Sequence, residues 1–377
     1  MHRLLLLGAG KIGSAIAKFL SHTGDYDVLV GDTDPRALDR LSKSCRVETV
    51  RLDVTSQTDL RKAMAGRQTV ISACSFACNP GIALAAADVG LSYFDLTEDV
   101  ATTNAVRKIS ATAKPGQIFM PQCGLAPGFV SIAANHLTKE FDTLEEVRLR
   151  VGALPQFPTN EMKYNLTWST DGLINEYGNP CEAIRDGKMI SVLPLEGLEH
   201  FSLDGVDYEA FNTSGGVGTL CETLDGRVNI LDYKTIRYRG HRNLIAFLMN
   251  ELRLNQRRDL LKDIFENAIP VTPQDVVLIF CTVTGKKDGY LTQITDARKI
   301  YANTVHGERW SAIQITTAAG MCAAVDLHAM GKRFDRGFVR QEQISLTEFL
   351  ENRFGKYYVT DGEEIAIKPE MPTRASS

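Results

Sequence analysis

A glycine-rich turn near the start of the chain constrains its fold more than any other feature. Residues 8–13 follow the pattern GxGxxG, directly after an apolar run and directly before a helical pattern of apolar residues. The first glycine allows a tight turn, the second lets a phosphate approach the backbone, and the third lets the helix pack closely on the strand. The helix N-terminus then offers free N–H groups to a pyrophosphate. We therefore predict dinucleotide contacts at Gly8, Gly10, Lys11, Ile12 and Gly13.

Strand-like and helix-like segments alternate from this turn to residue 122. Such alternation is typical of a doubly wound parallel sheet. We expect strands at Arg3–Leu7, Tyr26–Val30, Val47–Leu52, Thr69–Ala73, Tyr93–Leu96 and Ile118–Met120. We expect helices over Ile12–Leu20, from about Pro35, and over Leu60–Ala65, Ile82–Val89 and Ala105–Ala113.

The second half of the chain has a different pattern. A chain of 377 residues exceeds the size at which one core usually stops growing. Longer strand-like runs at Glu146–Gly152 and Asp275–Val283 predict a mixed sheet, and an apolar segment ending at Met330 predicts a helix that packs back on the first domain. We therefore predict an α/β fold with a Rossmann doubly wound parallel sheet and a second α/β domain with a mixed sheet. The expected domains are 1–122, completed by 307–350, and 123–306 for substrate binding and dimerisation.

Composition excludes several classes of protein. The formal net charge of -4 and the pI near 6.0 provide no basic field for a nucleic-acid partner. No uncharged stretch approaches the roughly 18 apolar residues of a membrane span, so we expect a soluble, cytoplasmic protein. The eight cysteines are scattered, and only Cys74 and Cys78 lie close together, which does not predict a metal site. A small-molecule substrate fits this composition best.

The carboxyl ends of the next strands predict further cofactor contacts. Asp32 ends the second strand, where its carboxylate can accept hydrogen bonds from the adenosine ribose; alternatively it is a turn or capping residue. A carboxylate there repels a 2′-phosphate and no arginine follows it, which favours NAD over NADP. Asp53 and Val54 follow the third strand, where Asp53 could contact the adenine or cap a helix. Ala73 and Cys74 follow the fourth strand and should lie beside the cofactor, with Cys74 as a lining residue.

Four ordered motifs carry a resemblance to a known family. They are Gly124–Gly128, Tyr164–Tyr177, Glu209–Leu220 and Tyr233–His241. Together with the glycine turn they resemble the saccharopine dehydrogenase family, and within it the chain looks most like the bacterial lysine 6-dehydrogenase branch. The resemblance runs from the N-terminus to about Gly331.

The resemblance implies NAD-dependent oxidation of the C–N bond at the lysine ε-carbon. The resulting imine would be hydrolysed to an aldehyde with release of ammonia, and a homodimer is implied by the resemblance alone. Such chemistry requires a base for the ammonium and the water, an anion or dipole near the iminium, and a cation for the substrate carboxylate. The alternatives are a saccharopine dehydrogenase that forms glutamate and a non-catalytic NAD-binding protein.

Several residues can meet these requirements. Asp95, after the fifth strand, could orient the amine or stabilise the iminium, or it could cap a helix. Arg237 is the better carboxylate clamp because its fork binds bidentately. Lys234 or His241 could be the acid/base, with a structural hydrogen-bonding role also open for His241. Because positions 234 and 237 differ by an odd number, both side chains need not face the site. Candidates for hydrogen bonds to the polar end of the substrate are Asn165, Thr213 and Ser214.

The runner-up substrate makes a different demand on the pocket. Saccharopine carries two more carboxylates than lysine, so its pocket should hold further arginines or lysines. The stretch Pro158–Tyr177 offers only Lys163. This favours the smaller amino acid, lysine.

Overall fold

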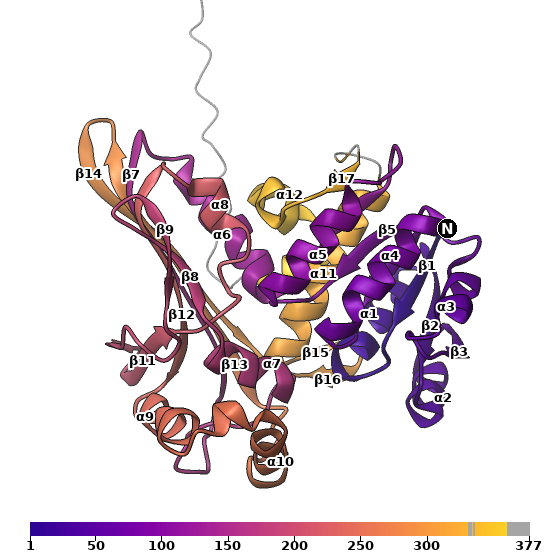
Figure 1. Ribbon diagram of the computed structural model, residues 1–377, viewed down its shortest axis with the longest axis horizontal. Helices are drawn as coiled ribbons and strands as arrows, with labels where there is room; N and C mark the ends of the chain where they lie inside the picture. Colours follow the sequence, from indigo (N-terminus) through magenta and orange to yellow (C-terminus); the bar gives the residue numbers. More distant parts are fainter. Residues whose placement is uncertain (331–333, 335, 360–377) are drawn as a thin grey trace, which may run out of the picture.

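The first lobe of the computed structural model is built on a sheet of parallel strands (Figure 1). The structure describes residues 1–330, 334 and 336–359. In this part of the chain the strand order reverses direction between β1 and β4, which places the carboxyl ends of these two strands beside the glycine turn. Across the sheet the strands are β3 (Glu48–Arg51), β2 (Tyr26–Asp32), β1 (His2–Leu7), β4 (Thr69–Ser72), β5 (Ser92–Asp95), β6 (Ile118–Met120) and β17 (Gly337–Phe338).

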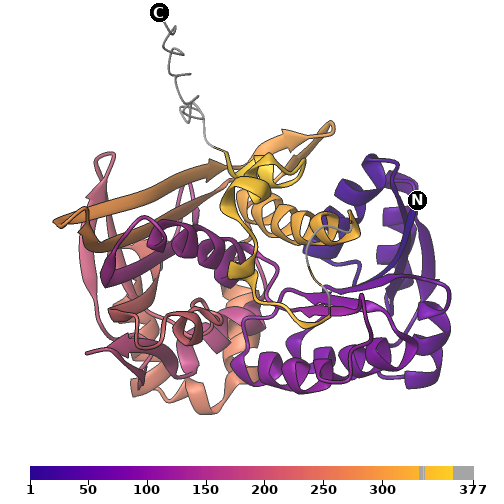
Figure 2. The ribbon, with the colours of Figure 1, turned by 90° about the horizontal axis from the view of Figure 1, so that it is seen from above.

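Side chains of β1 alternate between two cores because successive residues of a strand point to opposite faces. Leu4 and Leu6 belong to one apolar cluster, and Leu5 and Leu7 belong to the other. Helices cover both faces, as Figure 2 shows from above. One face packs against α1 (Lys11–His22), α2 (Pro35–Ser44) and α11 (Ala312–Ala329), and the other against α3 (Gln57–Met64), α4 (Asn79–Val89) and α5 (Val100–Ser110).

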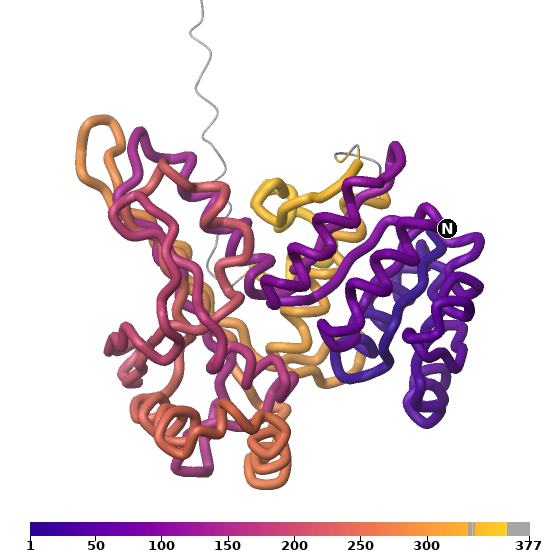
Figure 3. Tube along the Cα trace, viewed as in Figure 1, coloured from indigo at the N-terminus to yellow at the C-terminus, as the bar shows by residue number. Residues whose placement is uncertain are grey.

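Helix α11 belongs spatially to this first lobe although it follows the second lobe in the chain (Figure 3). It packs against α1, and β17 pairs with β6 in parallel. The first turn of α11 carries a capping box between Ser311 and Gln314. The buried carboxylate of Asp275 accepts hydrogen bonds from the amides of Ala312 and Ile313 in the same turn, at 2.5 and 3.0 Å. These contacts support the predicted completion of the first domain by 307–350, of which 331–333 and 335 lie outside the described residues. The exact boundaries stay predictions.

The second lobe is built on a mixed sheet. Strand β7 (Thr143–Pro155) is central: β12 (Val228–Tyr238) pairs with it in parallel, and β13 (Asp275–Lys287) pairs with it antiparallel. The other strands of the sheet are β10 (Glu199–Leu203), β11 (Val206–Asn212), β14 (Tyr290–Tyr301), β8 (Cys181–Arg185) and β9 (Lys188–Val192). A separate hairpin consists of β15 (Asn303–Val305) and β16 (Glu308–Trp310).

The inner face of the mixed sheet joins the core of the first lobe. Val147, Leu149 and Val151 on β7 share one buried cluster with residues of α6 (Val130–Thr138) and α11. The remaining helices of the second lobe and of the C-terminal segment are α7 (Thr170–Gly178), α8 (Leu220–Leu224), α9 (His241–Ala246), α10 (Arg258–Ala268) and α12 (Leu346–Glu351). The predicted fold class, a Rossmann sheet with a second mixed-sheet domain, is confirmed. No helix in the described ranges is both long and apolar enough to cross a membrane.

Candidate active site

The glycine turn has the shape that a pyrophosphate requires. Gly8 adopts a φ of 101°, and a Cβ atom there would lie 2.8 Å from the carbonyl oxygen of Ala73. A Cβ on Gly13 would lie 2.0 Å from the carbonyl oxygen of Gly8, whereas one on Gly10 would meet no atom within 4 Å. No side chain caps the first turn of α1, so its amides are free to bind an anion. These features fit a dinucleotide phosphate.

The carboxylate of Asp32 stabilises the glycine turn. It accepts hydrogen bonds from the amides of Ala9 at 2.6 Å and Asp34 at 2.8 Å. Asp32 is half-buried and keeps further lone pairs for a ribose, so the turn-forming role and the proposed ribose role are compatible. Helix α2 is capped by Asp34, which accepts from the amide of Arg36.

Asp53 uses its exposed carboxylate locally. It accepts from the amide and the hydroxyl of Thr55 at 2.9 and 2.7 Å, and these hydrogen bonds lower its pKa. Helix α3 has Ser56, not Asp53, at its N-cap position. The neighbouring Val54 is half-buried against the core. The adenine contact stays a prediction.

A cavity of about 400 Å³ lies where the two lobes meet. The first lobe contributes residues that follow β4 and β5 and two from α11, and the second lobe contributes the inner face of its sheet and α7. Ile12, Ala73 and Cys74 lie on its wall, and their contact with a cofactor stays a prediction. Burial raises the pKa of Cys74 to about 12, so this thiol is a neutral lining group. The polar and aromatic lining includes Thr97, Glu98, Trp168, Ser169, Asp171, Glu176, Tyr233, Thr235, Arg237 and Thr317.

Arg237 is held at the wall of this cavity by three hydrogen bonds. Its Nε donates to the hydroxyl oxygen of Tyr177 at 2.9 Å, and its Nη1 donates to Thr235 Oγ1 at 2.7 Å and to the Ile236 carbonyl at 2.8 Å. The rings of Tyr164 and Tyr177 lie 5.0 and 5.7 Å from its guanidinium carbon. The Nη2 atom has only a long ion pair, at 3.8 Å, with Oε2 of Glu176. These contacts orient the guanidinium and leave one amino group without a hydrogen bond among the described residues, and the carboxylate clamp stays a prediction.

Two glutamates of the cavity have unusual acidity. Burial raises the pKa of Glu98 to about 7, and burial raises that of Glu176 to about 8 although Arg237 lowers it. Glu98 lies in the loop after β5, and no cationic side chain of the described chain forms an ion pair with it. A carboxylate that titrates near neutrality in a cleft can act as a general base.

Backbone packing fixes the position of Glu98. Gly215 has a φ of 84°, and a Cβ there would lie 2.5 Å from the carbonyl oxygen of Glu98. A Cβ on Gly172 of α7 would lie 3.0 Å from Oε1 of Glu98. The glycines thus let two segments of the second lobe approach a loop of the first lobe.

Asp95 lies behind the cavity wall and does not line it. Its buried carboxylate accepts hydrogen bonds from the Tyr93 hydroxyl at 2.7 Å and from the amides of Thr97 and Gln122 at 2.9 and 3.1 Å. Its pKa is raised to about 6 by burial. These contacts fix the loop that carries Glu98, so Asp95 is placed as a positioning residue. Helix α5 is capped by Asp99 instead.

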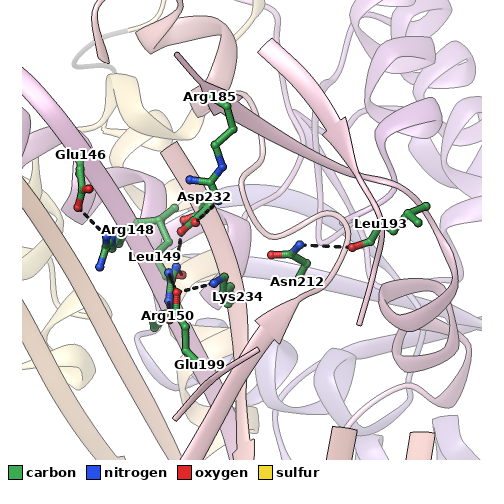
Figure 4. Close-up of polar contacts among 10 residues, drawn as sticks. All are labelled: Glu146, Arg148, Leu149, Arg150, Arg185, Leu193, Glu199, Asn212, Asp232 and Lys234. Atoms are coloured by element: carbon green, nitrogen blue, oxygen red, sulfur yellow. Dashed lines mark hydrogen bonds and ion pairs between the residues drawn. The ribbon is translucent and has the colours of Figure 1, made fainter. Parts of the chain in front are cut away.

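Lys234 points away from the cavity, which corrects its proposed acid/base role. Tyr233, Thr235 and Arg237 line the cavity from one face of β12, whereas Lys234 is on the other face because side chains alternate along a strand. Its Nζ forms an ion pair with Glu199 (Figure 4). Glu199 also binds Arg150, which pairs with Asp232 at 2.6 Å. Lys234 belongs to this ion-pair network on the outer side of the sheet.

His241 is buried outside the cavity wall, so its catalytic role is also corrected. Its pKa is lowered to about 3 by burial and by Arg237, which keeps the ring neutral. Nδ1 lies 2.8 Å from the Met162 carbonyl and therefore carries the proton, so that Nε2 accepts from the Tyr177 hydroxyl at 3.0 Å. The alternative hydrogen-bonding role describes this residue: it positions Tyr177, which positions Arg237.

The three predicted polar contacts for the substrate are buried outside the cavity wall. Ser214 donates its hydroxyl hydrogen to the Asn175 carbonyl at 3.1 Å. Asn165 Oδ1 and Thr213 Oγ1 are buried without a hydrogen-bond partner in the described structure. The sequence reading missed Glu98 and Glu176, although Glu98 follows a carboxyl end of the parallel sheet and Glu176 lies within the motif Tyr164–Tyr177. Trp168, in the same motif, also lines the cavity.

Two family models match the chain. Residues 4–120 match the saccharopine dehydrogenase NADP binding domain, and residues 124–356 match the saccharopine dehydrogenase C-terminal domain. A mitochondrial alpha-aminoadipic semialdehyde synthase of Rattus norvegicus is 23% identical over an alignment of 260 residues that covers 63% of this chain and 27% of that protein. Saccharopine dehydrogenase [NADP(+), L-glutamate-forming] of Saccharomyces cerevisiae is 25% identical over 202 residues, covering 50% of this chain and 43% of that protein. The chain thus matches less than half of the length of either relative.

Solved structures share the fold. Apo saccharopine dehydrogenase (L-Glu forming) from Saccharomyces cerevisiae superposes with a TM-score of 0.76 at 16% identity, covering 95% of this chain and 96% of that one. A homospermidine synthase from Legionella pneumophila in complex with NAD has a TM-score of 0.66 at 13% identity, covering 95% and 89%. Both likenesses extend over the two lobes.

Proposed function

Since the chain belongs to the saccharopine dehydrogenase family, we propose that it oxidises the C–N bond at the ε-carbon of lysine with a nicotinamide dinucleotide. The products are the aldehyde and ammonia. The observation that carries this proposal is the lining of the cavity: Arg237, Glu176 and Glu98 share one cavity at the edge of the Rossmann sheet, and Arg237 lies beside Glu176. Asp171 also lines the cavity, but its carboxylate forms an ion pair with Lys262 at 2.6 Å. The remaining charged groups, one cation and two carboxylates, match a substrate that has one carboxylate and two amino groups.

Glu98 is the base in this proposal. Hydride leaves the ε-carbon only when the nitrogen is neutral, so Glu98 first accepts a proton from the ε-ammonium. When bound, the nicotinamide supplies the hydride acceptor. Glu98 then releases this proton to solvent, and its carboxylate stabilises the iminium. It takes a second proton from the water that adds to the carbon and donates it to the nitrogen as ammonia leaves. The balance is one ε-ammonium group, one oxidised dinucleotide and one water to one aldehyde, one ammonium ion, one reduced dinucleotide and one proton.

Asp32 supports NAD as the dinucleotide. Its carboxylate stands at the end of β2, and Thr33 and Asp34 follow it in place of an arginine that could bind a 2′-phosphate. The homospermidine synthase of similar fold contains NAD, whereas the yeast relative is named for NADP(+). Initial rates with each dinucleotide test this choice: we expect a lower Michaelis constant for NAD, and a lower one for NADP would contradict it.

Glutamate-forming saccharopine oxidation is the second candidate, because curated relatives carry this name. Saccharopine has three carboxylates, whereas Arg237 is the only arginine or lysine among the described residues that line the cavity. This lining favours lysine. A non-catalytic NAD-binding protein is the third candidate, and the near-neutral pKa of Glu98 in the cavity argues against it.

The deciding experiment is reduction of NAD by the purified protein with L-lysine or L-saccharopine, followed by assays for ammonia and glutamate. Turnover of lysine with ammonia release supports the proposal. Turnover of saccharopine alone favours the second candidate, glutamate-forming saccharopine oxidation. Absence of turnover with either substrate, with intact NAD binding, favours the third, a non-catalytic protein. Homodimerisation and a cytoplasmic location stay predictions from the resemblance and the composition.

A further inference from the structure

We propose that Glu176 and Arg237 together recognise the head of a free α-amino acid, with Glu176 binding its ammonium and Arg237 binding its carboxylate. The site would thereby select unmodified α-amino acids over simple amines, ω-amino acids and N-acylated amino acids. This inference rests on the proposed function for the identity of the reacting end, but it concerns the opposite end of the substrate.

The side chains of Glu176 and Arg237 lie close to each other without a hydrogen bond. Oε2 of Glu176 lies 3.8 Å from Nη2 of Arg237, beyond hydrogen-bond distance. That oxygen is buried and has no hydrogen-bond partner in the described structure. A buried carboxylate oxygen without a partner is costly, and a ligand that donates hydrogen bonds to it would remove this cost.

Arg237 keeps an unused hydrogen-bond donor, and Glu176 keeps an unused acceptor. The other nitrogens of Arg237 are engaged by Tyr177, Thr235 and the Ile236 carbonyl, so Nη2 is the donor that remains. Oε2 of Glu176 is an acceptor that remains. An α-amino acid presents a carboxylate and an ammonium on one carbon, so it can engage this donor and this acceptor at the same time.

The pair is also held rigidly, as recognition of a small head group requires. Glu176 is part of α7, which begins at a Ser169 cap that accepts from the amide of Gly172. Arg237 lies near the end of β12, where the strand is paired with β11, and has aromatic rings beside its guanidinium.

Glu98 marks the reacting end of the same cavity. It belongs to the loop after β5 and shares the cavity wall with Ala73 and Cys74, which follow β4. Ligands of such sheets bind at these carboxyl ends. Glu176 and Arg237 come from the second lobe, so a substrate bound across the cavity would have its α-carbon toward the second lobe and its side chain toward the first.

The test uses L-norleucine, which has the amino-acid head of lysine but no ε-amino group. We expect calorimetry in the presence of saturating NAD to detect L-norleucine binding to the native protein, and Glu176→Gln to weaken it at least tenfold. Glu182→Gln is the matched control, since Glu182 is also a half-buried glutamate of the second lobe but does not line the cavity, and it should change this affinity by no more than about threefold. Equal affinity of the native protein and Glu176→Gln for L-norleucine would overturn the inference.

A second comparison needs no variant and so does not depend on folding. Hexanoate lacks the ammonium, pentylamine lacks the carboxylate and N-acetyl-L-norleucine has a blocked nitrogen. We expect each to bind the native protein at least tenfold more weakly than L-norleucine. Comparable binding of any of them would overturn the inference.

Turnover separates this inference from the proposed function. If the protein oxidises no amine but binds L-norleucine in a manner that depends on Glu176, the proposed function fails and the head assignment stands. If it oxidises lysine but Glu176→Gln alters neither the Michaelis constant for lysine nor L-norleucine binding, the proposed function stands and the head assignment fails.

Discussion

The Nε atom of Arg237 lies 2.9 Å from the hydroxyl oxygen of Tyr177, which accepts its hydrogen. The same hydroxyl donates to Nε2 of His241, whose other ring nitrogen donates to the Met162 carbonyl. A neutral histidine thereby fixes the direction of the tyrosine hydroxyl, and the tyrosine fixes the plane of the guanidinium. Substrate binding by Arg237 should therefore depend on residues that never touch the substrate.

Tyr177→Phe tests this dependence. Removal of the hydroxyl leaves Arg237 Nε without its acceptor, so the guanidinium should lose its fixed orientation. We expect the Michaelis constant for the amino acid to rise about tenfold, which corresponds to about 1.4 kcal/mol, with kcat changed less than threefold. Tyr238→Phe is the matched control, since its hydroxyl bonds the Pro155 carbonyl and it does not line the cavity. Equal Michaelis constants in Tyr177→Phe and the native protein would rule out the positioning role.

Glu98→Gln should remove the base. The amide cannot accept the ammonium proton, so we expect kcat to fall by roughly 10²–10⁴-fold, with NAD binding retained in a fluorescence titration. In the native protein, kcat/KM should rise with pH and level off only above about 8, since the pKa of Glu98 is raised to about 7 and that of Glu176 to about 8, and both act in their ionised forms. A variant that keeps more than a tenth of the native kcat would show that another group is the base.

The buried glutamates also predict how stability depends on pH. Burial raises the pKa of Glu176 to about 8 from an ordinary value of 4.5. Between these values the folded protein retains a proton that the unfolded chain has released, so the free energy of unfolding should fall as pH rises from about 4.5 to about 8. Urea unfolding across this range should show a smaller decrease in Glu176→Gln. Identical pH dependence in the two proteins would contradict the raised pKa.

Lys234→Met separates the two roles that Lys234 could have. Because Lys234 pairs with Glu199 on the outer side of the mixed sheet, its loss should lower the free energy of unfolding by about 2 kcal/mol. We expect kcat/KM to stay within about threefold of the native value. Loss of activity without loss of stability in urea unfolding would restore Lys234 as an acid/base candidate.

The first lobe is predictable from the sequence because its signals are local. The glycine turn, the alternating leucines of β1 and the apolar helices each act over a few residues, and the structure confirms the sheet that they predict. The family resemblance rests on motifs of similar length and is confirmed by two family models.

The site is less predictable because contacts between distant residues decide it. Asp95 and Glu98 both follow β5, but only Glu98 reaches the cavity, since Tyr93 and the amide of Gln122 hold the Asp95 carboxylate. The odd spacing of Lys234 and Arg237 predicts opposite faces. The sequence does not reveal which face meets the cavity, because that depends on pairing with β7 and β11 and on Glu199.

Helix α11 limits how the nucleotide-binding lobe can be treated as a module. It covers the Rossmann sheet beside α1, yet it comes after the mixed sheet in the chain, and Asp275 at the start of β13 caps it. A graft of residues 1–122 alone would leave the apolar side of α1 bare. Any chimera that exchanges substrate lobes must therefore retain α11 and a carboxylate at its cap. The nucleotide-binding lobe and the substrate lobe can thus not be exchanged as independent units.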